Sequence, residues 1–175
     1  MSTPQIIFWA SAAVLLFWAI GAYNRLVRLR GAIVRQFVPV ESQLTQRLGL
    51  LAQQLDALAP VLLNATPRLD ALRAACQQCG AACSHAKVRP GAVGAITSLR
   101  LADEILGDAR ARLPVQSVAG ADLSALNAQL AAADTTLAFA RRQFNAAVIE
   151  YNKAVRQFPT LLIGGLFGFR AAGTF

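Results

Sequence analysis

An uncharged apolar run near the N-terminus constrains this chain more than any other feature. Ile6 to Ala22 are seventeen consecutive residues without a charge, and Ser11 is the only polar residue among them. As an α-helix the run is roughly 26 Å long, at the low end of what crosses a bilayer. The sequence therefore predicts one transmembrane helix over residues 6–23, which would hold the rest of the chain at a membrane surface.

A cleaved signal peptide and a buried core helix are the alternatives for this run. A signal peptide needs a basic segment before the run and a small-residue cleavage site after it. Residues 1–5 carry no charged side chain, and no convincing site of that kind follows the run. A core helix would show a polar stripe. Trp18 and Tyr23 suit the aromatic belt at the far membrane interface, which favours a retained anchor.

Four arginines directly after the run set the expected orientation: Arg25, Arg28, Arg30 and Arg35. Basic residues close to a membrane helix stay on the cytoplasmic side. Residues 1–5 would then lie outside, with the body in the cytoplasm, in a single-pass protein of the cytoplasmic (inner) membrane. The same four arginines can contact anionic headgroups at about 1 kcal/mol each. Membrane lipid is therefore the first expected partner.

The charge of the chain follows from the same segment. The 17 basic and 9 acidic residues give a net charge of +8, and residues 1–35 contribute four basic and no acidic side chains. Half of the excess is therefore next to the predicted membrane helix. The chain has no basic stripe interleaved with aromatics and no nucleic-acid motif, so we expect no nucleic-acid partner.

Helical periodicity covers residues 24–158. Apolar residues recur about every 3.6 positions after the anchor, so we expect the membrane helix to continue into the first bundle helix, with bends at Pro39 and Pro60. Thr66-Pro67 is a typical helix start. A second helix, a turn over residues 86–91 and a third helix over residues 92–112 follow. The fold class is therefore all-α.

The fourth helix has the most regular pattern, with apolar positions that step by three and then four residues. They are Leu123, Leu126, Leu130, Ala133, Leu137, Ala140, Phe144, Ala147, Tyr151, Ala154 and Phe158. This five-heptad seam predicts an antiparallel four-helix bundle, and it also allows a homo-oligomer. Basic residues expected on the exposed face would repel a parallel copy, which favours packing within one chain. They are Arg141, Arg142, Lys153 and Arg156.

Pro159 should stop this helix, and residues 159–175 form an apolar C-terminal segment. Leu161 to Phe169 is rich in glycine and too short to span a bilayer. Two interpretations stay open. The segment caps the end of the bundle, or it lies on the bilayer with Arg170 among the headgroups.

The residues also resemble a known family. Tyr23 to Arg30, beginning with Tyr23-Asn24, is similar to the opening of LemA family proteins after their membrane helix. Residues 140–152 resemble the family's tyrosine–asparagine repeat, with Phe144-Asn145 and Tyr151-Asn152 as the two pairs and Phe144 in place of the first tyrosine. Phe158-Pro159 resembles the Phe-Pro stop, and Leu161 to Phe169 the apolar ending. Phe37, Glu41 and Arg47 stand where the family usually has a tryptophan, an acidic residue and a basic pair.

The resemblance implies a single N-terminal membrane helix and a four-helix bundle in the bacterial cell envelope. It implies no enzymatic activity. Asn145 and Asn152 are seven residues apart and share one helix face, beside the seam. They are either structural asparagines that fix the register of the bundle or a ladder that recognises a partner helix.

The cysteines superficially resemble a metal knuckle, because His85 follows Cys76, Cys79 and Cys83. Their spacing of three and four residues instead places all three on the apolar stripe of the second helix. Free cysteine behaves as a small buried hydrophobic residue, which is the favoured interpretation. We expect no metal and no cofactor.

The acidic cluster of Asp103, Glu104 and Asp108 is expected to be a solvated helix face, with surface pairs to Arg100 and Arg112. No catalytic residue is therefore expected. The favoured function is a non-enzymatic scaffold or adaptor at the membrane surface, which binds another membrane or membrane-associated protein, or itself. The alternative is a redox or ligand sensor that uses the cysteine-bearing second helix.

Overall fold

The computed structural model describes residues 3–60, 66–113, 123–158 and 160–175. It contains α1 (Thr3–Leu58), α2 (Thr66–Val88), α3 (Val93–Ala111), α4 (Ser124–Arg156) and α5 (Thr160–Leu166). No strand occurs in those ranges, which confirms the all-α expectation. The expected starts of α2 and α3 are within one residue of those observed. Pro159 and the connection over residues 114–122 lie outside the described residues.

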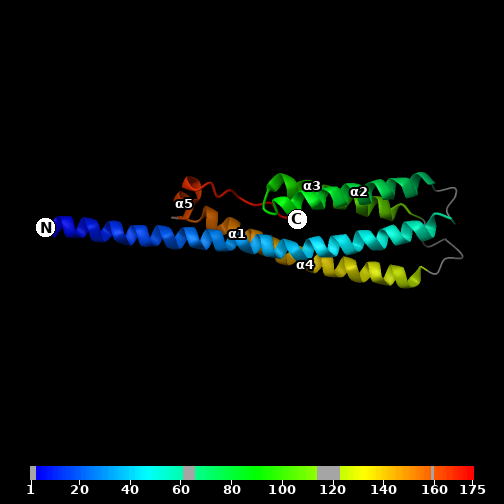
Figure 1. The fold of residues 1–175 in the computed structure, drawn as a ribbon, viewed down its shortest axis with the longest axis horizontal. Helices are drawn as coiled ribbons and strands as arrows, with labels where there is room; N and C mark the ends of the chain where they lie inside the picture. The colour runs from blue at the N-terminus through cyan, green and yellow to red at the C-terminus, as the bar shows by residue number, and fades with distance from the viewer. Residues whose placement is uncertain (1–2, 61–65, 114–122, 159) are drawn as a thin grey trace.

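The first helix is one continuous element of 56 residues, or about 84 Å. Its N-terminal part projects beyond the bundle with no other helix packed on it (Figure 1). The expected continuity between the apolar run and the bundle is confirmed. Pro39 lies inside this helix without ending it. Pro60 does not bend the helix, because α1 ends at Leu58 before that proline is reached.

The second half of α1 forms the bundle with α2, α3 and α4, and each of these helices runs antiparallel to the one before it (Figure 1). It packs along α4 and also on α2, while α2 and α3 pair as a helical hairpin. Its core residues recur every three or four positions, because that spacing keeps one face turned inward. They include Leu26, Ile33, Phe37, Val40, Leu44 and Leu51. The rings of Phe37 and Phe144 meet edge to face, with centroids 5.7 Å apart.

The buried stripe of α4 departs from the predicted seam near its C-terminal end. Val148 and Val155 are buried and Ala147 is half-buried. Phe158 is 76 % exposed because it lies beyond the end of α4 at Arg156. A straight helix with 3.6 residues per turn drifts by about 20° per heptad against a strict seven-residue repeat. Over five heptads the drift reaches about 100°, or one residue. The strict heptad prediction was therefore wrong for this last stretch.

Helix α5 packs against both α1 and α4 at the end of the bundle from which α1 projects (Figure 1). It buries Ile163 and Gly164. The ring of Tyr23 lies 5.1 Å from that of Phe167 and 5.7 Å from that of Phe169, measured between centroids. The apolar ending and the end of the predicted membrane helix are thus in contact.

Helices α3 and α4 lie further apart than the helix pairs α1–α4 and α2–α3 do. Among the described residues, no α-carbon of α3 lies within 8 Å of one in α4. Long charged side chains and the C-terminal tail, residues 170–175, occupy the space between these helices. Figure 1 shows this tail running back from α5 along the bundle towards α3.

Candidate functional site

Two asparagines on α4 hold the C-terminal tail. Asn145 accepts a hydrogen bond from the main-chain N–H of Phe175 at 2.8 Å and donates one to the main-chain oxygen of Phe175 at 2.6 Å. Asn152 does the same with Ala172, at 2.7 and 2.9 Å. A primary amide presents the same donor and acceptor as a peptide group. Each asparagine therefore pairs with the tail as a neighbouring strand would.

The spacing of the two pairs has a simple geometric reason. Seven helical residues rise about 10.5 Å, and three extended residues span about 10 Å. Asn145 and Asn152 are seven residues apart on α4, and their partners, Phe175 and Ala172, are three apart on the tail. An α-helix and an extended chain can therefore stay in register over this distance, with the chains running in opposite directions.

Tyr151 adds a third bond, because its buried hydroxyl donates to the main-chain oxygen of Arg170 at 3.0 Å. Phe144, the residue in the place of the first repeat tyrosine, is fully buried against Phe37. Asn24 is exposed. The structure thus places Tyr151, Asn152 and Asn145 together on the tail, whereas Tyr23 and Asn24 lie elsewhere. The amide groups of Asn145 and Asn152 are used within the chain, as the structural interpretation requires.

The tail is also confined by α3. A side chain at Gly173 would place its Cβ 2.9 Å from the α-carbon of Val93, closer than such atoms approach, so only glycine fits here. On the other side, the guanidinium of Arg141 lies 4.2 Å from the centroid of the Phe175 ring, a cation–π distance.

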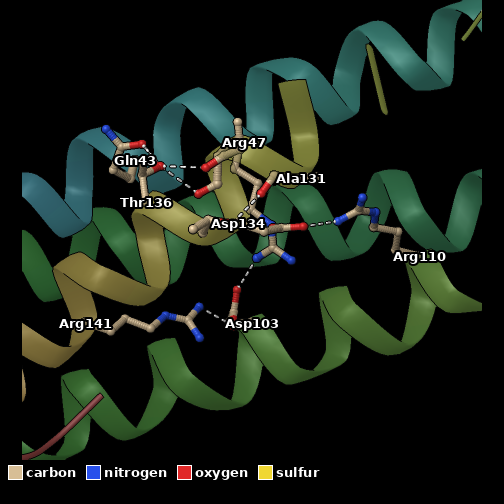
Figure 2. Close-up of polar contacts among 11 residues, drawn as sticks. Gln43, Arg47, Asp103, Arg110, Ala131, Asp134, Thr136 and Arg141 are labelled. Atoms are coloured by element: carbon tan, nitrogen blue, oxygen red, sulfur yellow. Dashed lines mark hydrogen bonds and ion pairs between the residues drawn. The ribbon is translucent and has the colours of Figure 1, made fainter. Parts of the chain in front are cut away.

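A cluster of five charged residues joins α1, α3 and α4 in the middle of the bundle (Figure 2). Arg47 of α1 lies 2.6 Å from Asp103 of α3 and 2.8 Å from Asp134 of α4. Asp103 also pairs with Arg141, and Asp134 pairs with Arg110 at 2.7 Å. The side chains of Arg47 and Asp103 are only 9 % and 12 % exposed.

This charged cluster corrects two expectations. Asp103 does not lie on a solvated face, and Arg141 does not lie freely exposed on α4, because the two are paired with each other and both are at least partly buried. Glu104 does pair with Arg100 on the surface, at 3.9 Å. Buried charges are stable only when they are paired. These ion pairs therefore hold α1, α3 and α4 in one relative alignment. Arg141 links the charged cluster to the tail through its contact with Phe175.

Sequence reasoning missed this cluster, although a signal was present. Arg47 lies between Leu44 and Leu51 at steps of three and four, which is a position of the buried stripe itself. Asp103 stands in the same relation to Leu99 and Leu106. A charged residue at such a position predicts a buried partner of opposite sign.

The three cysteines lie on the packed side of α2. Cys79 and Cys83 are buried and Cys76 is half-buried, and all three are free thiols. Burial raises the pKa of Cys79 to about 12 and that of Cys83 to about 11, and it also raises the pKa of Cys76. No group of three potential metal ligands occurs among the described residues. Because reactive cysteines need a lowered pKa, this environment does not favour the redox alternative.

The four arginines after the apolar run are all exposed. Arg28 and Arg35 are seven residues apart and share a face of α1, whereas Arg30 is turned roughly 200° from Arg28. The run itself is exposed along almost its whole length. By length and composition α1 can cross a membrane, and no other helix in the described ranges passes the same test.

A protein-family model matches the C-terminal part of this chain. No curated protein and no solved structure matches the chain. The model of the LemA family matches residues 118–175, which include α4, α5 and the tail. The resemblance read from the paired asparagines and the apolar ending is thereby confirmed, and this C-terminal part of the chain is similar to the LemA family.

Proposed function

We propose that this chain is a non-enzymatic scaffold or adaptor, anchored in the cytoplasmic membrane by the first part of α1 and binding a membrane-associated protein or a second copy of itself. One observation carries the proposal. The same helix is exposed and apolar over its first part and supplies the bundle core over its second. Val14, Leu15 and Phe17 are 67, 65 and 74 % exposed.

Exposed apolar surface of this extent is unfavourable in water, at about 25 cal/mol per Å². A contiguous apolar patch of more than a few hundred Å² typically marks a membrane or a protein interface. Since α1 has no break between the apolar part and the core, the bundle cannot turn independently of its anchor. A scaffold that holds a partner at a fixed height above the bilayer needs such a rigid connection.

The exposed apolar face of α5 supports the same arrangement. Leu161, Leu162, Leu166 and Phe167 are between 51 and 78 % exposed, whereas the opposite side of the helix is buried on the bundle. This face begins where the predicted membrane helix ends, at Tyr23. It would rest in the headgroup region beside the anchor.

Orientation can be tested with two cysteine substitutions at exposed positions, Thr3→Cys on the N-terminal side and Gln77→Cys on α2, each compared with the parent chain and its three native thiols. A maleimide that cannot cross the membrane should label Thr3→Cys in intact cells and Gln77→Cys only after permeabilisation. The reverse pattern would overturn the orientation. Recovery of the full chain in the soluble fraction after cell breakage would overturn the anchor.

Partner binding can be tested by site-specific photocrosslinking in native membranes. Outer apolar residues are the best probe positions: Leu101 and Ile105 lie four apart on α3, and Phe139 is 62 % exposed on α4. A discrete crosslinked product at one of these positions, and none at the exposed polar position Gln77, would support an adaptor. A product of twice the chain mass would identify the partner as a second copy. No product at any of them would contradict the proposal.

A further inference from the structure

A cavity of about 620 Å³ opens between α1, the α2–α3 turn and the residues around the C-terminal tail. Its volume is in the range of pockets that bind small ligands, about 300–1,000 Å³. Three separate segments supply its charged lining: Arg30 from α1, Arg89 from the turn and Arg170 from the tail. The bond from Tyr151 to the main chain of Arg170 fixes the tail on this side of the cavity.

The charge inside this cavity has one sign. No acidic side chain is among the residues that line it. None of its three arginines forms an ion pair within the part of the chain that the structure describes. The buried arginine of α1, Arg47, is instead paired with two aspartates. The lining of the cavity therefore carries three positive charges and no acidic side chain to balance them.

The N-terminus of α3 meets the same cavity. Ala92 and Val93 line it, and Ala92 is the N-cap residue, without a side-chain hydrogen bond to the first turn. The first N–H groups of a helix have no partner within the helix, and the helix dipole makes this end partly positive. An anion at this position would receive support from both the arginines and the helix end.

We propose that this cavity binds a phosphate group, carried by a phospholipid headgroup or by a soluble phosphate ester. Guanidinium groups bind phosphate oxygens through paired hydrogen bonds, and a phosphate monoester carries a charge of about −1.5 to −2 that three arginines can balance. Arg30 lies seven residues beyond Tyr23, or about 10 Å along the helix, which places the cavity close to the bilayer surface. Binding of a phospholipid headgroup rests on the proposed membrane anchor, whereas binding of a soluble phosphate ester does not.

The test uses the full chain in a neutral detergent. Isothermal titration with glycerol 3-phosphate measures the soluble source. Native mass spectrometry with short-chain phosphatidylglycerol, compared with a diacylglycerol that lacks the phosphate, measures the lipid source. Arg30→Gln, Arg89→Gln and Arg170→Gln should each weaken binding about tenfold, the effect of removing one charge-assisted hydrogen bond. All three arginines are exposed, so these variants should keep the stability of the parent chain.

Arg142→Gln is the matched control, since Arg142 is an exposed arginine on α4 outside the cavity. Binding of glycerol 3-phosphate would assign a soluble ester, and binding of phosphatidylglycerol alone would assign a headgroup. Either result supports the site only if the three cavity variants weaken binding and Arg142→Gln leaves it unchanged; binding that the cavity variants do not weaken would overturn the proposal. The proposal is overturned if neither probe binds, or if Arg142→Gln weakens binding as much as the cavity variants do. A soluble chain that still binds glycerol 3-phosphate would contradict the anchor but not the site.

Discussion

At the scale of single residues, the paired asparagines have a role that their sequence positions did not reveal. Their side-chain amides replace a neighbouring strand and pair with the main chain of the tail. Asn152→Ala removes one donor and one acceptor that Ala172 uses. We expect the free energy of unfolding to fall by about 1–3 kcal/mol, because the main-chain groups of Ala172 lose their partner.

Chemical denaturation of the full chain measures this change, and amide hydrogen exchange at residues 170–175 should become faster. Asn24→Ala is a suitable control, because Asn24 is exposed and far from the tail in sequence. Its effect should stay within about 0.5 kcal/mol. Equal effects of the two substitutions would show that the tail pairing contributes nothing.

The cysteines allow a prediction about pH. A thiol reacts as its thiolate, so the raised pKa values of Cys79 and Cys83 should keep alkylation of the folded chain far slower than that of the denatured chain at neutral pH. The folded state retains these protons above pH 9.0, the ordinary value, and releases them only near pH 11 to 12. Stability should therefore decrease as the pH rises through this interval. Mass spectrometry of iodoacetamide adducts measures the alkylation rates of the folded and the denatured chain. Equal rates in the two states would contradict the prediction of slow alkylation.

At the scale of elements, α3 and α4 are joined by charges where their backbones do not meet. Arg47→Met leaves Asp103 and Asp134 with one arginine each and removes the residue that links them to α1. Removal of one partner from a buried ion pair costs about 3–5 kcal/mol, and the remaining pairs suggest the lower end of that range. Thermal unfolding should show the loss.

Arg100→Met is the matched control for this prediction. Its pair with Glu104 is long, and both side chains are more than half exposed. An exposed pair of this kind contributes about 0–1 kcal/mol. If the two arginine substitutions had similar effects, burial of the charged cluster would not explain its contribution.

The position of the tail depends on the close contact between Gly173 and the backbone of Val93. Gly173→Ala would bring a methyl group within 2.9 Å of the Val93 backbone, so the tail must move and its bonds to α4 must stretch or break. Gly165→Ala meets nothing within 4 Å and serves as the control. We expect faster proteolysis of residues 170–175 in Gly173→Ala only. Unchanged proteolysis would show that the tail tolerates the displacement.

At the scale of the whole molecule, the anchor and α5 should form one apolar surface at the end of the bundle. Phe167→Trp, in a chain where Trp9 and Trp18 are replaced by phenylalanine, reports on this surface. In nanodiscs its fluorescence should be quenched by bromine-labelled lipids, because Phe167 lies beside Tyr23. Leu101→Trp, on the outer face of α3, should not be quenched. Equal quenching at both positions, or none at Phe167, would contradict membrane contact by α5.

The sequence by itself determined the helices, because the spacing of apolar residues along a chain is a local property. It located the starts of α2 and α3, the continuity of α1 and the buried character of Cys79 and Cys83. Composition also identified the apolar run, since its length and lack of charge depend on no other segment. The drift of the α4 stripe was open to sequence reasoning as well, because it follows from helix geometry alone.

Only the tertiary structure decided which polar groups meet. Arg47, Asp103 and Asp134 come from three helices, and Arg30, Arg89 and Arg170 from three other segments. Whether such residues pair or stay without counter-charge depends on how far apart the backbones settle, which no local pattern encodes. The Asn145 and Asn152 amides could equally have bound water or a partner. They bind the tail because α5 reverses the chain and lays residues 170–175 back along α4.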